Sequence, residues 1–149
     1  MTQEDRKLLI KDLCGRSYYK VKLSVIYNDK EYEGTLCAIY PEDNRVIIDN
    51  LNKPCHYPNQ TCGGFIIDEH NVKPYLFPLS SMTEGQKKEF SLITCDLNDS
   101  DYWKDGNMIY VDDKYQLNDI IDFYHKNHLD YRGLIEKGLA IDCTNLNIY

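Results

Sequence analysis

The sequence contains no long apolar run and no basic run. No stretch approaches the roughly 20 consecutive apolar residues that a membrane-spanning helix requires, so no membrane span is predicted. Lysine and arginine never form a run of five, and the 149 residues carry a net charge of −7. Because nucleic-acid binders gain much of their affinity by neutralising phosphates, this balance argues against a nucleic-acid partner.

Several motifs that identify enzymes are also missing. There is no G-x-S-x-G elbow of a serine hydrolase and no G-x-x-x-x-G-K-S/T phosphate-binding loop. Acidic residues are plentiful, but no spacing assigns two of them as a general acid and a general base. No residue is therefore given a catalytic role, and a non-enzymatic protein is expected.

The chain also has no apolar N-terminal segment. Residues 1–7 are polar, so no secretory signal is predicted. Without such a signal, the six cysteines are expected to be reduced thiols inside a cell. A cytoplasmic protein is the resulting expectation.

Alternating apolar residues predict a series of short strands in the first half of the chain. The clearest alternation lies in residues 18–27. Turn residues separate it from the next expected strands, which are residues 32–39, 45–49, 65–67 and 72–76. Five short strands with tight turns are typical of a small antiparallel β-barrel, since closure removes the exposed edges of a sheet. An SH3-like barrel is the first choice and an OB-like barrel the second.

Helices are predicted on both sides of this barrel, which gives an α+β fold. Thr2 is a suitable N-cap for a helix of about a dozen residues that stops at Gly15. After the proline-containing joint, Thr83 and Gln86 predict a capping box for a second helix. An apolar stripe predicts another helix over residues 117–128. Residues 1–79 are thus expected to form a helix and barrel, with the mainly helical residues 80–149 packed on them as one compact unit.

Tyr131 and Arg132 are the first candidates for contact with a ligand or partner. They follow the last predicted helix, and the guanidinium fork of arginine clamps anionic or planar groups well. In the competing interpretation, Arg132 pairs with Asp130 or Glu136 and only fastens the C-terminal tail. Both interpretations are kept.

Three further residues are candidate contacts. Lys20 and Lys22 lie on one face of the first expected strand and could help to hold an anion. Tyr75 belongs to an unusually large set of 13 tyrosines, whose side chains serve in contacts as readily as in a core.

A metal site is considered in the long loop between the third and fourth expected strands. The loop, residues 50–64, exceeds the usual length of a connection. Soft ligands in and after it could bind zinc, although the paired C-x₂-C spacing of strong zinc motifs is missing. These candidate ligands are Cys55, His56, Cys62 and His70.

His125 and His128 form a second histidine pattern. They share a helix face with Asp122 one turn earlier, which suits two metal ligands or a base oriented by a carboxylate. The same pattern arises when cationic residues are favoured near a helix C-terminus, and this plainer interpretation is preferred.

Two longer strings carry a resemblance to a known family. They are residues 72–84, VKPYLFPLSSMTE, and residues 128–140, HLDYRGLIEKGLA, supported by Leu13-Cys14 and by the turn at residues 41–43. With them the chain resembles a family of short uncharacterised proteins that are abundant in gut-bacterial genomes, mobile elements and phages. The resemblance implies a phage or mobile-element setting and a role in host takeover or counter-defence.

The expected function is a non-enzymatic module that binds a host or phage protein through a tyrosine-rich face. The first alternative is a protein that sequesters a small anionic, nucleotide-like ligand with the arginine, lysine and tyrosine candidates above. The second alternative is a zinc-dependent enzyme. The oligomeric state is left open.

Overall fold

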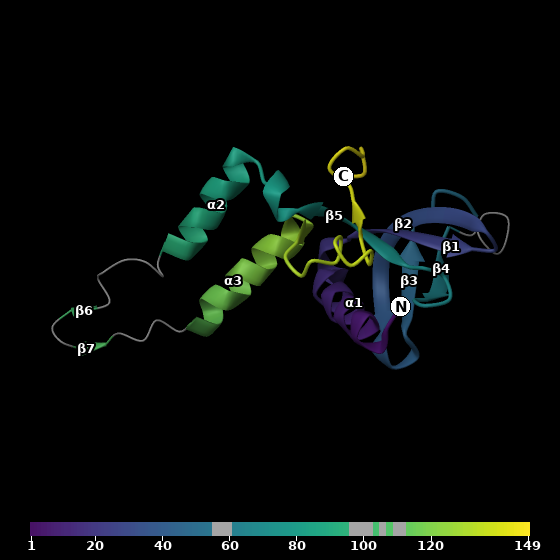
Figure 1. Cartoon of the computed structure of the whole chain (residues 1–149), viewed down its shortest axis with the longest axis horizontal. Helices are drawn as coiled ribbons and strands as arrows, with labels where there is room; N and C mark the ends of the chain where they lie inside the picture. Colours follow the sequence, from purple (N-terminus) through teal and green to yellow (C-terminus); the bar gives the residue numbers. More distant parts are fainter. Residues whose placement is uncertain (55–60, 96–102, 105–106, 109–112) are drawn as a thin grey trace.

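The computed structural model describes residues 1–54, 61–95, 103–104, 107–108 and 113–149 (Figure 1). It is an α+β protein, as predicted. Its helices are α1 (Gln3–Arg16), α2 (Glu84–Cys95) and α3 (Asp113–Lys126), with short 3₁₀ turns η1 (Ser17–Tyr19), η2 (Pro41–Asp43) and η3 (Leu79–Ser81). Its strands are β1 (Lys22–Tyr27), β2 (Lys30–Tyr40), β3 (Arg45–Asp49), β4 (Gly63–Ile66), β5 (Lys73–Pro78), β6 (Trp103–Lys104), β7 (Asn107–Met108), β8 (Leu129–Asp130) and β9 (Ile141–Asp142).

The main sheet is open. Its strand order is β4-β3-β2-β1-β5-β8, and β9 also pairs with β5. The first five strands pair antiparallel, whereas β8 and β9 run parallel to β5. A closed barrel, whether SH3-like or OB-like, is therefore not confirmed. The reason is that β5 continues past β1 into pairings with the C-terminal segment, and the described residues show no ladder joining the two ends of the sheet.

Strand β2 pairs with two neighbours and has an irregular register. Its first half pairs with β1 and its second half with β3, and the register shifts between Leu36 and Ala38. A glycine inside a strand often marks a bulge, yet the irregularity lies beyond Gly34 along the strand. Gly34 instead permits a close approach, because a Cβ there would come within 2.5 Å of Ile48 and 2.7 Å of the Asp49 carbonyl.

Helix α1 begins with the expected cap. The Thr2 hydroxyl accepts the Asp5 N–H at 3.1 Å, and the Asp5 carboxylate accepts the Thr2 N–H at 3.3 Å. The helix does not stop at Gly15 but continues to Arg16. A 3₁₀ turn follows, so β1 begins at Lys22, four residues later than predicted.

One apolar core joins α1, the sheet and the C-terminal segment. Leu9 and Leu13 of α1 pack on β1 residues such as Leu23. Leu134 and Leu139, from the second half of the chain, are buried in the same cluster. The C-terminal segment therefore contributes to the core that the first five strands form.

Helices α2 and α3 lie side by side and extend away from the sheet (Figure 1). The capping box of α2 forms as predicted, with the Thr83 N–H donating to Gln86 and the Gln86 N–H donating to Thr83. Phe90 of α2 stacks against Phe123 and Tyr124 of α3, with ring centroids 5.3 and 5.5 Å apart. No helix in the described part of the chain is long and apolar enough to cross a bilayer.

Candidate binding groove

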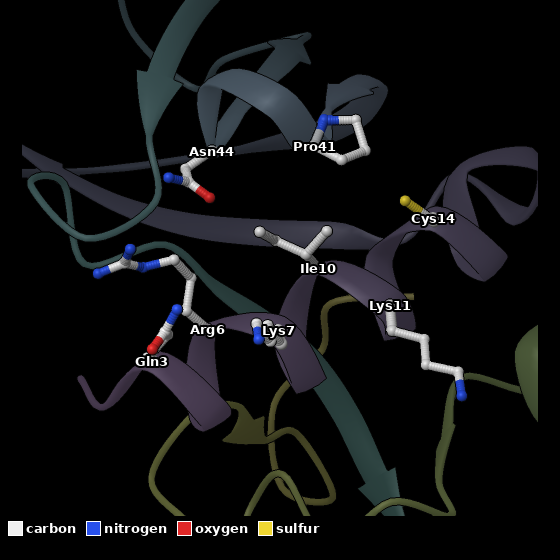
Figure 2. Close-up of a pocket in the computed structure, with 8 residues that line it drawn as sticks. All are labelled: Gln3, Arg6, Lys7, Ile10, Lys11, Cys14, Pro41 and Asn44. Atoms are coloured by element: carbon white, nitrogen blue, oxygen red, sulfur yellow. The ribbon is translucent and has the colours of Figure 1, made fainter.

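A groove runs along the outer face of α1. Its cavity volume is about 600 Å³, and η2 forms the opposite wall (Figure 2). The α1 residues that line it follow one another along the helix, and two residues of the turn face them. The lining consists of Gln3, Arg6, Lys7, Ile10, Lys11, Cys14, Pro41 and Asn44.

The groove combines an apolar floor with a cationic side. Ile10 packs against the core, and Pro41 faces it across the groove. Lys7 and Lys11 are exposed and one helical turn apart. The third cation, Arg6, pairs with Asp68 at 2.5 Å. Three cationic side chains thus line one groove of a protein whose net charge is −7.

The end of the groove at the C-terminal part of α1 lies near a carboxylate. The Cys14 thiol lies there, and burial together with the nearby Glu42 carboxylate raises its pKa. Raising the thiol pKa keeps Cys14 protonated, which makes it a weak nucleophile. The cationic groove therefore has an acidic neighbour, Glu42, near its Cys14 end.

Sequence reasoning missed this groove. The sequence predicts the first helix, with an end one residue too early, but assigns no binding role to it. A signal did exist, because Gln3, Lys7, Ile10 and Cys14 recur at the spacing of one helix face. What the sequence could not show is that η2 would stand opposite that face, since β2 and β3 must first pair to place the turn there.

The structure places Tyr131 and Arg132 side by side, with the Arg132 guanidinium 4.6 Å from the centre of the Tyr131 ring. Arg132 pairs with neither Asp130 nor Glu136. Its Nε lies 3.3 Å from the Asp12 carboxylate of α1, and its side chain is only 19% exposed. Both residues therefore take part in an internal cluster between α1 and the C-terminal segment.

Asp12 and Arg16 are the centre of that cluster, and both side chains are fully buried. The Arg16 Nε donates to Asp12 at 2.5 Å, and Nη2 donates to the Leu129 carbonyl at 2.7 Å. The guanidinium also lies 5.7 Å from the Tyr131 ring centre. Because a buried charge is costly unless it is paired, these contacts tie α1 to the segment after α3.

His125 lies in the last turn of α3, whereas His128 lies beyond the end of α3 at Lys126, with φ +52°, so, contrary to the prediction, the two do not share a helix face. His125 Nε2 lies 2.9 Å from the Tyr131 hydroxyl, whereas the His128 ring stacks on Tyr149. Burial, reinforced by the nearby Arg16, lowers the pKa of each histidine to about 4. Both rings are therefore neutral at pH 7.

The remaining contact candidates, Lys20, Lys22 and Tyr75, do not form one site. Lys20 is exposed, directly follows η1 and does not line the pocket that contains Lys22 and Tyr75. Lys22 and Tyr75 line a second, smaller pocket of about 160 Å³ together with Glu33. The Tyr75 hydroxyl donates to the Glu33 carboxylate at 2.8 Å, and burial and this carboxylate raise the pKa of Tyr75.

Half of the proposed zinc ligands can be located. Cys55 and His56 lie outside the described residues. Cys62 is exposed, and His70 Nδ1 lies 2.9 Å from the Ile66 N–H, close to the start of β5. Across the described residues, no three or more His, Cys, Asp or Glu side chains are grouped so as to hold a metal ion.

Comparison with known proteins adds no relative. No family model matches the chain, and neither a curated protein nor a solved structure is significantly similar to it.

Proposed function

We propose that the protein is a non-enzymatic binding module of a phage or mobile element, and that it binds an acidic segment of a host or phage protein in the α1 groove. One observation supports the proposal: two exposed lysines, Lys7 and Lys11, line one side of a groove with an apolar floor in an otherwise acidic protein. An anionic segment with apolar residues matches both properties.

The charge distribution gives this groove selectivity. The rest of the acidic surface repels an anionic partner, while the groove attracts it, so the partner is steered to one site. Lys7 and Lys11 have exposed side chains, and no ion pair of theirs is found within the described part of the chain. A partner carboxylate can therefore pair with either one without displacing an internal acid.

The groove is a better candidate than the residues first considered. Arg132 and Tyr131 are occupied with Asp12 and His125, and Lys22 shares its small pocket with a carboxylate. A nucleotide-like anion would have to break those contacts or overcome that charge. Binding in the groove breaks no internal contact and meets no lining carboxylate. The groove therefore replaces the tyrosine-rich face as the preferred binding site.

The scaffold proposal is a modified SH3-like barrel. It is supported by the strand order β4-β3-β2-β1-β5 and by the register shift in β2, whose first half pairs with β1 and second half with β3. In this proposal the C-terminal strands occupy the β5 edge.

The test is a binding titration with labelled short peptides that contain Glu and Leu in random order. The expected result is saturable binding that weakens with salt, and no binding of the matched peptides in which Gln replaces Glu. Lys7→Glu/Lys11→Glu should abolish binding. The control Lys30→Glu/Lys88→Glu changes the same charge at exposed sites outside the groove and should leave binding intact.

Two outcomes would overturn the proposal. One is an equal loss of binding in both double variants, which would reduce the effect to net charge. The other is tight binding of a nucleoside triphosphate that excludes the peptides from the groove, which would favour the small-ligand alternative.

A further inference from the structure

We infer that the segment bound in the groove is an amphipathic α-helix with acidic residues one turn apart. The inference rests on the proposed function and deepens it, because it specifies the conformation and the charge spacing of the partner. Three observations support it: the length of the groove, the backbone hydrogen bonds of its walls and the spacing of its two exposed lysines.

The groove is long enough for a helix. The lining residues from Gln3 to Cys14 all belong to one face of α1. At 1.5 Å per residue, the distance along the helix axis is about 16 Å, which corresponds to about three turns of a partner helix lying alongside. Ile10 is near the middle, where an apolar side chain of the partner would be shielded best.

The turn side of the groove offers no free sheet edge for an added strand. On the turn side, the Asn44 N–H donates to the Pro41 carbonyl at 3.3 Å, and the Asn44 carbonyl accepts the Ile67 N–H at 2.9 Å. On the other side, the interior N–H and C=O groups of α1 are engaged within the helix. An extended peptide gains affinity by adding to a free sheet edge, whereas a helix satisfies its own backbone.

The charges specify the acidic face of the partner. Lys7 and Lys11 are separated by one turn, or about 6 Å along the axis, and acidic residues at i and i+4 of a partner helix have the same rise. Arg6 is already paired with Asp68, so Lys7 and Lys11 are the lining cations left to meet the carboxylates of the partner. Lys7 lies four residues from Gln3 and Lys11 three residues from Cys14, so the acidic turn of the partner should lie at the middle of the groove.

The test uses three synthetic peptides of about eleven residues with identical composition except where stated. The first places Leu on one helical face with Glu residues at i and i+4 beside it. The second has the same residues in scrambled order. The third keeps the order of the first but carries a central proline, which breaks the helix.

Fluorescence anisotropy and circular dichroism then measure affinity and helicity together. The first peptide should bind about tenfold more tightly than the other two and gain helicity on binding, since two charge pairs are worth about 1.4 kcal/mol. Lys7→Glu/Lys11→Glu should remove this preference, whereas Lys30→Glu/Lys88→Glu should retain it.

The outcomes separate the two proposals. Equal binding of all three peptides, lost in Lys7→Glu/Lys11→Glu, would overturn the helix inference and leave the acidic-segment function standing. Absence of binding by every Glu-containing peptide, including the random ones, would overturn both.

Discussion

The ring of Tyr149 lies flat on the imidazole of His128, with ring centroids 4.0 Å apart and planes inclined by 11°. The Tyr149 hydroxyl accepts the Lys22 N–H at 3.0 Å and donates to the Tyr75 carbonyl at 2.9 Å. The ladder between β1 and β5 pairs Leu23 with Pro74, so Lys22 and Tyr75 would be the next pair. The phenol thus bridges the two strands where their direct pairing ends.

Tyr149→Phe should lower the free energy of unfolding by about 1–2 kcal/mol, because it leaves the Lys22 N–H and the Tyr75 carbonyl without their bridging partner. Urea unfolding followed by circular dichroism measures the change. Tyr18→Phe removes the same hydroxyl from a side chain that is 85% exposed and should have no effect. Equal losses in the two variants would contradict the bridging role.

The buried cluster predicts a non-additive pair of mutations. Asp12→Ala leaves the buried Arg16 guanidinium without its carboxylate and should cost about 3–5 kcal/mol of stability. Asp12→Ala/Arg16→Met removes both charges and should cost less than Asp12→Ala alone. A double-mutant cycle by urea unfolding measures the coupling. Additive losses would show that the two side chains do not depend on each other.

The sequence was informative where one residue and its near neighbours decide the structure. Thr2 and Thr83 cap their helices within four residues, and β3 lies where the apolar run of residues 45–49 predicts it. The edges of the sheet depend on longer-range contacts. Pairing of β5 with β8 and β9 joins segments far apart in the chain, and no local pattern encodes it.

The same distinction explains the candidate residues. The sequence predicts a ligand contact for Tyr131 and Arg132, or a pairing of Arg132 with Asp130 or Glu136, but the carboxylate beside Arg132 is that of Asp12 on α1. Sequence spacing could offer only nearby acids such as Asp130 and Glu136 as partners. Contacts over this separation follow from packing of α1 against α3, which single-sequence patterns do not specify.

The neutral His125 predicts acid sensitivity. Its pKa is lowered to about 4 in the folded protein and is near 6.5 when unfolded, so between these values the unfolded chain binds the extra proton. Stability from this group is complete above about pH 6.5 and is lost as the pH falls toward 4. At pH 5 the loss should be about 2 kcal/mol.

His125→Gln tests this origin of the acid sensitivity. Glutamine does not titrate, so the fall in unfolding free energy between pH 7 and pH 5 should be smaller in the variant than in the parent by about 2 kcal/mol. Urea unfolding at pH 7 and pH 5 gives the change in unfolding free energy with pH for each protein. Comparing these two changes cancels any pH-independent loss of stability that the substitution causes. An equal fall in unfolding free energy in the variant and the parent would assign the acid sensitivity to other groups.

Gly15 predicts an unusual response to alanine. In an ordinary helix interior, Gly→Ala stabilises by about 0.5–1 kcal/mol. At Gly15, however, the added Cβ would collide with the His125 ring, so Gly15→Ala should destabilise the protein by pushing α1 away from α3. Gly85→Ala in α2 is the matched control, because a Cβ there meets only the Thr83 hydroxyl at 3.9 Å, and it should be neutral or stabilising. Thermal unfolding of both variants measures whether each substitution raises or lowers the unfolding temperature. A stabilised Gly15→Ala protein would refute the close packing of α1 on His125.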